Sequence, residues 1–181
     1  RYCAGEVFVL ILVFAGVSGA GKSYVAEELA RRTGRQRVGF GDYVRYKAEL
    51  ESIPLEYSAL QELGHSLVSS GPKQFMQDVL KHGELDIRED LLIDGLRHST
   101  VLDALRDIAA PQKVLLIFVE TCDEIIASRL VDRGMKNSKS GLGPVDLQVQ
   151  KGLRSCADLV IDGAHGIEEN IALINEAERR H

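Results

Sequence analysis

The octet "GVSGAGKS" at residues 16–23 holds the residue types that chemistry on phosphate requires. It fits the pattern G-x-x-x-x-G-K-[ST], with Gly16, Gly21, Lys22 and Ser23 at the defined positions. Glycines allow unusual backbone angles, so that consecutive N–H groups can point inward around a phosphate. The Lys22 ammonium can act on β- and γ-phosphate oxygens, and the Ser23 hydroxyl can ligate Mg²⁺. We therefore predict an ATP site made by Gly16, Ser18, Gly19, Ala20, Gly21, Lys22, Ser23 and Tyr24.

The segments on either side of the octet decide whether it is a phosphate loop. The apolar run "VFVLILVFA" at 7–15 has the length of a signal-peptide core, with a basic residue in front of it. It is too short for a membrane-spanning helix, which needs about 20 apolar residues. The stretch 23–32 places Val25 and Leu29 at helical spacing. A phosphate loop requires a strand before it and a helix after it, whereas a signal peptide requires neither, so we favour the loop.

A carboxylate and an arginine follow another buried run, "LLIDGLRH". Asp94 ends the predicted strand, at the sheet edge where ligands bind in such folds. We predict that Asp94 and Ser23 hold Mg²⁺, with Asp94 acting through water; the alternative for Asp94 is a turn-forming role before Gly95. Arg97 comes directly after the same strand and points the same way, toward an acceptor. His98 is interpreted as a surface or core histidine rather than a catalyst.

The motif "GDYVR" offers a second charged pair for the acceptor. Asp42 and Arg45 are three residues apart, so on the first turn of a helix they share a face. Arg45 could fork onto an acceptor phosphate. Asp42 could serve as a catalytic base or as a ligand in the metal shell. The alternative is an Asp that caps the helix and an Arg that is simply exposed.

The stretch "RLVDRGMKNSKSG" contains a third basic element. Arg129 and Arg133 form an i, i+4 pair on one helix face, followed by a polar segment with Lys136 and Lys139. Such an element can close over a triphosphate and neutralise the charge that develops during transfer. We therefore predict catalytic roles for Arg129 and Arg133, together with Lys22. The alternative is a solvated charged face.

The elements that must position these residues alternate between strand-like and helix-like runs. Strands are expected at 7–15, 37–41, 90–95, 113–120 and 157–162. Helices are expected at 23–32, at 43–82 with breaks at Pro54 and Pro72, and at 100–109, 123–132 and 166–180. This order predicts an α/β fold: a mainly parallel five-stranded sheet with helices on both faces. We expect one domain over 1–181, with a helical acceptor-binding insertion at about 43–88 and a lid at about 129–146.

Composition narrows the class of partner. The formal net charge of −5 argues against nucleic acid and against a membrane surface. The three cysteines, Cys3, Cys122 and Cys156, match no zinc or redox spacing, which favours a reducing, cytoplasmic setting. Cys156 lies beside an apolar stretch and is expected to be a small buried residue. Nothing in the sequence indicates an oligomeric state.

Taken together, these motifs resemble the P-loop nucleoside-monophosphate kinase group, of the adenylate-kinase-like and dephospho-CoA-kinase-like types. The octet matches the phosphate loop of that group. "FGDYVR", "LIDGLRH" and "RLVDRG" resemble its acceptor and lid motifs, and "CADLVIDGAHGIEENI" resembles the dephospho-CoA-kinase ending. The resemblance implies that Arg45 and Arg97 grip the acceptor phosphate, and that Arg129 and Arg133 stabilise the transferred group. The chain departs from the pattern where "IDG" replaces "I-x-N" at Asp162–Gly163.

The function expected from this resemblance is transfer of the γ-phosphoryl group of ATP, with Mg²⁺, to a small-molecule nucleotide acceptor. A monophosphate acceptor needs chiefly arginines, whereas a hydroxyl acceptor, as in dephospho-CoA, benefits from a carboxylate base such as Asp42. Both remain open. Because the chain begins at Arg1, an NTP-binding or NTP-hydrolysing module of a larger protein is kept as a rival. Kinase activity on a nucleic-acid end is disfavoured by the acidic net charge.

Overall fold

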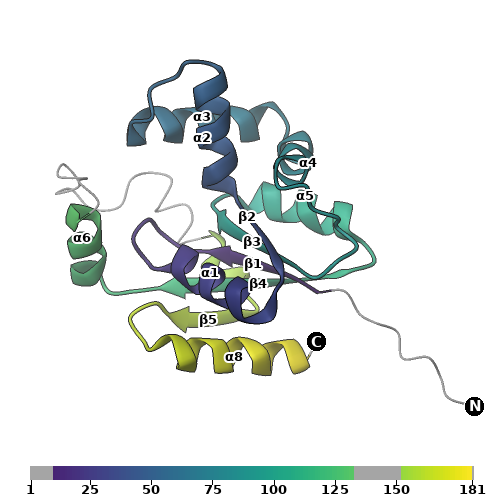
Figure 1. The fold of residues 1–181 in the computed structure, drawn as a ribbon, viewed down its shortest axis with the longest axis vertical. Coiled ribbons are helices and arrows are strands. Elements are labelled where there is room, and N and C mark those ends of the chain that lie inside the picture. Colours follow the sequence, from purple (N-terminus) through teal and green to yellow (C-terminus); the bar gives the residue numbers. More distant parts are fainter. Residues whose placement is uncertain (1–9, 133–151, 181) are drawn as a thin grey trace, which may run out of the picture.

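The computed structural model describes residues 10–132 and 152–180, and its described strands form a parallel sheet at the centre of the fold (Figure 1). The sheet has five strands in the order β2-β3-β1-β4-β5. Their bounds are β1 Leu10–Ala15, β2 Gln36–Gly39, β3 Leu91–Leu96, β4 Lys113–Glu120 and β5 Leu159–Asp162. The predicted α/β class and its parallel five-stranded sheet are thus confirmed.

The helices cover both faces of the sheet because the central strands are apolar on both sides (Figure 1). Along β1, Ile11 and Val13 pack into one core cluster, and Leu12 and Phe14 pack into another. The first cluster is covered by α2 Phe40–Leu50, α3 Tyr57–Ser70, α4 Pro72–His82 and α5 Ser99–Ala109. The second is covered by α1 Lys22–Thr33, α6 Asp123–Asp132 and α8 Ile167–Arg179. Among residues 10–132 and 152–180, no helix is long and apolar enough to cross a membrane.

The boundary between the second strand and the helix that follows it differs from the sequence prediction. The second strand ends at Gly39 rather than at residue 41, and Phe40 already begins α2. Phe40, Tyr43 and Val44 are all buried, and their i, i+3, i+4 spacing places them on one helix face. The expected breaks at Pro54 and Pro72 are present: Pro54 lies between α2 and α3, and Pro72 starts α4 at a position where a missing N–H costs nothing.

Cys156 corrects a further expectation, since this residue is exposed rather than buried. It ends the short 3₁₀ helix Arg154–Cys156, and the preceding Leu153 occupies the buried position, 1% exposed. Of the predicted lid, the helical start up to Asp132 is α6, and 133–146 lies outside the described residues.

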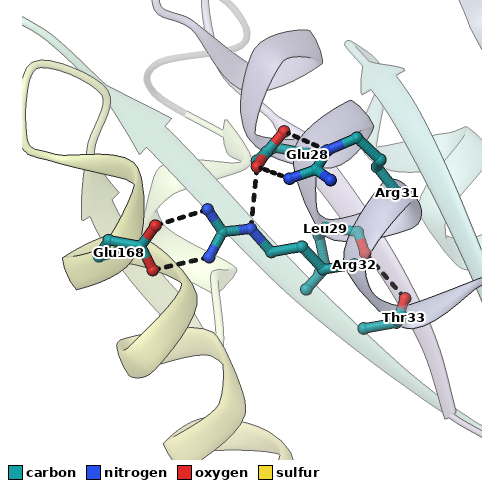
Figure 2. Close-up of polar contacts among 6 residues, drawn as sticks. All are labelled: Glu28, Leu29, Arg31, Arg32, Thr33 and Glu168. Carbon is teal, nitrogen blue, oxygen red and sulfur yellow. Dashed lines mark hydrogen bonds and ion pairs between the residues drawn. The ribbon is translucent and has the colours of Figure 1, made fainter.

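An ion-pair network ties α1, the helix after the phosphate loop, to α8 (Figure 2). The Arg32 guanidinium donates to both oxygens of Glu168 at 2.6 Å and to Glu28 at 2.9 Å. Arg31 also donates to Glu28, and together Arg31 and Arg32 lower the pKa of the Glu28 carboxyl to about 2. At the end of α1, the Thr33 hydroxyl donates to the Leu29 carbonyl at 2.8 Å. The network fixes the C-terminal half of the helix whose N-terminus carries the phosphate loop.

Candidate active site

The phosphate loop lies between β1 and α1, where its backbone takes left-handed angles that only glycine adopts easily. The φ angles of Gly16, Gly19 and Gly21 are 147°, 84° and 101°. A Cβ atom on Gly16 would lie 2.3 Å from the carbonyl oxygen of Val119 on β4, so any larger residue would push the loop off the sheet. The helix that follows begins at Lys22, so the positive end of its dipole faces the loop.

The side chains of this loop divide into those that face a cavity and those that do not. The cavity has a volume of about 500 Å³, and the loop contributes Ser18, Gly19, Lys22 and Ser23 to its wall. The Lys22 side chain is buried, and its ammonium donates to the Val17 carbonyl at 3.1 Å. Gly16, Ala20 and Gly21 shape the loop without lining the cavity, and the Tyr24 side chain is 61% exposed.

Asp94 lies at the carboxyl end of β3 in the same cavity. The residue is 4% exposed, and its Oδ1 atom has no hydrogen-bond partner among the described residues. A buried carboxylate oxygen without a partner is costly unless a ligand or a water completes it. Hard oxygen ligands such as this carboxylate and the Ser23 hydroxyl suit Mg²⁺, so the residues present fit the predicted ion.

Arg37 is a functional candidate that sequence reasoning missed. Its guanidinium lies on β2, within 3.5 Å of Asp94, 3.4 Å of Glu27 and 3.8 Å of Asp42. It therefore neutralises carboxylates from three elements (α1, α2 and β3), all of which line the same cavity as the phosphate loop. The sequence feature that could have identified Arg37 is a charged residue within a short strand. A charge next to the core is costly in free energy unless an opposite charge compensates it.

Asp42 and Arg45 lie on one face of α2, as their spacing predicts. Arg45 donates to Asp42 Oδ1 at 2.6 Å, and both side chains line the cavity. The alternative in which Asp42 caps the helix is not supported, because the N-cap is Gly39 and no side-chain cap hydrogen bond forms there. The carboxylate instead holds the guanidinium in place.

Arg97 connects the segment after β3 to the phosphate loop and to α3. Its Nη2 atom donates to Ser18 Oγ at 2.9 Å, and its Nη1 atom donates to Gln61 of α3 at 3.0 Å. The Tyr57 hydroxyl donates to the same Ser18 oxygen at 3.4 Å. The structure thus brings together Lys22, Ser23, Asp42, Arg45, Asp94 and Arg97 around a single cavity.

Arg129 contacts the backbone of the phosphate loop. Its guanidinium donates to the backbone carbonyls of Gly19 and Ala20, both at 3.2 Å, and to that of Gly163 at 2.9 Å. It does not line the cavity in this structure. Arg133, the second predicted lid arginine, lies outside the described residues, as do Lys136 and Lys139.

The departure noted at Gly163 has a structural reason. A Cβ atom at this position would lie 1.9 Å from the Ala20 carbonyl oxygen and 2.7 Å from Thr121 Oγ1. Thr121 itself donates to the same Ala20 carbonyl at 2.9 Å. The backbone after β5 therefore packs directly on the phosphate loop, which leaves no room for a side chain.

A family model described as an AAA domain matches residues 12–159. The chain belongs to this family. Adenylate kinase 1 of a Nostoc strain is 27% identical over 135 residues, which cover 70% of either chain. Among solved structures, shikimate kinase from Acinetobacter baumannii in complex with shikimate has 15% identity and a TM-score of 0.60 over 96% of both chains.

A second solved structure has a fold similar to that of this chain. APS kinase of Mycobacterium tuberculosis, in complex with AMPPNP and APS, has 15% identity and a TM-score of 0.61 over 95% of this chain and 98% of that one. Together these relatives confirm the predicted resemblance to the P-loop kinases of the nucleoside-monophosphate kinase group. They support kinase chemistry and leave the acceptor open.

Proposed function

We propose that this protein transfers the γ-phosphoryl group of ATP to a nucleotide-like small-molecule acceptor. The observation that carries the proposal is the shared cavity, in which a phosphate loop and the acceptor-motif residues Asp42, Arg45 and Arg97 line one space of about 500 Å³. This volume is in the range of small-ligand pockets. A donor and an acceptor held in one such space react as if they were a single molecule.

On the donor side, the loop N–H groups and Lys22 would hold the triphosphate of ATP. Ser23 and Asp94 would hold Mg²⁺, which when bound supplies positive charge to the phosphate oxygens. Arg129 supports this side indirectly, because its hydrogen bonds hold the carbonyls of Gly19, Ala20 and Gly163 in place. The catalytic contribution of the chain is thus positioning and charge stabilisation.

On the acceptor side, Arg45 and Arg97 would hold the acceptor phosphate. Asp42 engages Arg45 at 2.6 Å and lies 3.8 Å from Arg37, so its carboxylate is already committed to two guanidinium groups. It is better placed to orient Arg45 than to accept a proton. A phosphate acceptor needs no base, because its oxygens are already ionised at neutral pH, and this favours the monophosphate type.

The apolar part of the cavity suits a flat ring. Phe40 and Phe75 stack with their ring centroids 5.6 Å apart and an interplanar angle of 17°, and both line the cavity beside Val44 and Leu60. Such a surface pairs well with the face of a nucleobase. The combination of apolar wall and arginines is what a nucleotide requires.

Phosphorylation of a hydroxyl group is the second candidate, because the Asp42 carboxylate does line the cavity. Structural relatives named for shikimate and for APS show that the fold alone does not fix the acceptor. A module that only binds or hydrolyses NTP is the third candidate, and it gives no reason for Arg45 and Arg97 to line the same cavity as the loop. We place the reaction in the cytoplasm, in keeping with the free thiols of Cys122 and Cys156.

The test is ADP release from ATP and Mg²⁺ against nucleoside monophosphates, deoxynucleotides, dephospho-CoA, shikimate and APS. We expect turnover that depends on one nucleotide acceptor. Turnover with shikimate only would contradict the nucleotide assignment. ADP release that no acceptor changes would leave the NTP-hydrolysing module as the function.

A further inference from the structure

Helix α3 forms one wall of the cavity. The residues that it contributes along one helix face include Leu60, Gln61, Gly64 and Val68. Leu60 and Val68 also pack on the hydrophobic core, so their place on this face is explained by packing. Packing does not explain Gln61 and Gly64, and the cavity itself is the remaining reason for both.

Gly64 is a glycine that the fold does not require. It lies in the middle of α3, where glycine destabilises a helix relative to alanine. Its backbone is helical and is not left-handed. Among the described residues, a Cβ atom at this position would meet only Val44 Cγ2, at 3.7 Å, which is an ordinary van der Waals distance. Neither a turn nor a close approach therefore accounts for the glycine.

The missing side chain leaves space beside Gln61. A helical side chain covers the turn on the N-terminal side of its own Cα atom, so a side chain at position 64 would lie over the turn of Leu60 and Gln61. Val44 of α2 is buried and bounds this space from the other side. Gly64 thus keeps open the part of the cavity between α2 and α3 that adjoins the Gln61 side chain.

The hydrogen bond from Arg97 orients the amide of Gln61. Arginine can only donate, and Arg97 Nη1 donates to Gln61 Oε1 at 3.0 Å, so the amide oxygen faces the guanidinium. Within residues 10–132 and 152–180, the Nε2 group of Gln61 has no hydrogen-bond partner. Gln61 therefore offers a ligand in the cavity two N–H donors, while its own acceptor oxygen is already engaged.

We propose that α3 reads the base of the acceptor nucleotide: the base occupies the space left by Gly64, and Gln61 Nε2 donates to a keto oxygen at C6 of a purine or C4 of a pyrimidine. The stacked rings of Phe40 and Phe75 supply the apolar surface for such a ring. Adenine and cytosine carry an amino group at these carbons, which would need the acceptor that Gln61 has given to Arg97. That the acceptor is a nucleotide rests on the proposed function, whereas the preference for keto bases rests on Gln61.

Two pairs of nucleotides test this preference, because the members of each pair differ in that one substituent. IMP has a keto oxygen where AMP has an amino group, and UMP differs from CMP in the same way. Calorimetric titration into protein saturated with AMPPNP and Mg²⁺ measures their binding without turnover. In the pair that binds more tightly, we expect the keto member to bind about tenfold or more tightly than the amino member. Equal or tighter binding of the amino member, or no binding of either pair, would overturn the proposal.

Gln61→Glu makes the test specific to this side chain. The carboxylate still accepts from Arg97, but its second oxygen accepts where the amide donates. We therefore expect the preference to reverse, in favour of AMP over IMP or of CMP over UMP. An unchanged preference in this near-isosteric variant would show that Gln61 does not read the base.

Gly64→Ala separates the need for space from the need for stability. Alanine is the better helix former, so the melting temperature should rise by about 2–4 °C. The preferred nucleotide should bind about tenfold or more weakly, because the methyl group occupies its space. Ser69→Ala, at an exposed position of α3, is the matched control: it also introduces a better helix former and should leave binding unchanged. A lower melting temperature or wild-type affinity in Gly64→Ala would contradict the role of Gly64.

The outcomes separate this inference from the proposed function. Keto-selective binding without transfer of phosphate from ATP would end the proposed function and leave the assignment of Gln61 and Gly64 intact. Transfer to AMP or CMP as readily as to IMP or UMP would support the proposed function and overturn that assignment.

Discussion

Arg97 Nη2 donates to Ser18 Oγ at 2.9 Å, which joins the segment after β3 directly to the phosphate loop. The residue expected to hold the acceptor and a residue of the donor loop are therefore one hydrogen bond apart. Transfer between two phosphates needs them close and in line, and loss of about 1 Å of alignment is expensive.

Arg45→Ala should weaken the acceptor more than the donor. The variant removes a charge-assisted contact to the acceptor phosphate, so the acceptor KM should rise about 10- to 100-fold while the KM for ATP changes little. Steady-state kinetics with each substrate varied in turn measure both. Arg88→Ala is the control, because Arg88 is an exposed arginine paired with Asp86 outside the cavity. An unchanged acceptor KM in Arg45→Ala would show that Arg45 does not touch the acceptor.

Arg37→Met should destabilise the protein in a way that Mg²⁺ partly reverses. The Asp94 side chain is buried and would lose its cationic partner, which costs about 1–3 kcal/mol in the free energy of unfolding. Mg²⁺ bound at Asp94 would replace the missing positive charge. Urea unfolding with and without Mg²⁺ measures both effects. The double variant Arg37→Met, Asp94→Asn should regain part of the stability, and Mg²⁺ should no longer stabilise it. If Mg²⁺ changes the stability of wild type and of both variants equally, there is no metal at Asp94.

Gly163→Ala should displace the phosphate loop, because residue 163 packs against it. Its new Cβ atom would lie 1.9 Å from the Ala20 carbonyl oxygen, so the loop must shift. We expect about 1–3 kcal/mol of lost stability and weaker ATP binding, measured by thermal unfolding and by titration with AMPPNP. Gly166→Ala is the matched control: its Cβ atom would meet nothing within 4 Å, so it should stay within about 0.5 kcal/mol of wild type. Equal ATP affinity in both variants would remove Gly163 from the support of the loop.

Glu28→Gln should change the acid dependence of stability. The pKa of Glu28 is lowered to about 2 by Arg31 and Arg32, so its ion pairs stabilise the fold fully above the ordinary carboxyl pKa near 4.5. This contribution is lost as the pH falls from about 4.5 through 2. The variant should therefore be less stable than wild type at pH 7, with a difference that shrinks toward pH 2. Urea unfolding across this range measures it, and a difference that does not vary with pH would show that the network of Figure 2 contributes nothing through Glu28.

Local patterns account for the parts of the fold that the sequence predicted well. The apolar runs at 91–96 and 113–120 read as buried strands because each is bounded by polar or turn-forming residues. The backbone angles of the phosphate loop require glycines at fixed positions within the octet, so the octet was sufficient to predict the loop. Strand order was not predicted, because the pairing of β1 with both β3 and β4 joins segments that are far apart in the chain.

The site residues that escaped prediction act through contacts between distant segments. Arg37 matters because Asp94 and Glu27 converge on it from other elements. The contacts of Arg129 with the loop carbonyls also join distant segments, and the motif that predicted Arg129 gave no sign of them. The periodicity of a short sequence segment does not show which distant segments will lie next to it in the fold.

The most direct test of the phosphotransferase account follows the fate of the γ-phosphate of [γ-³²P]ATP in the presence of Mg²⁺ and the acceptor panel. We predict that the label appears in one nucleotide acceptor, in equal amount to the ADP formed, and that Lys22→Ala reduces the rate by about 100-fold or more. Label found only as inorganic phosphate, at a rate that no acceptor changes, would contradict the account.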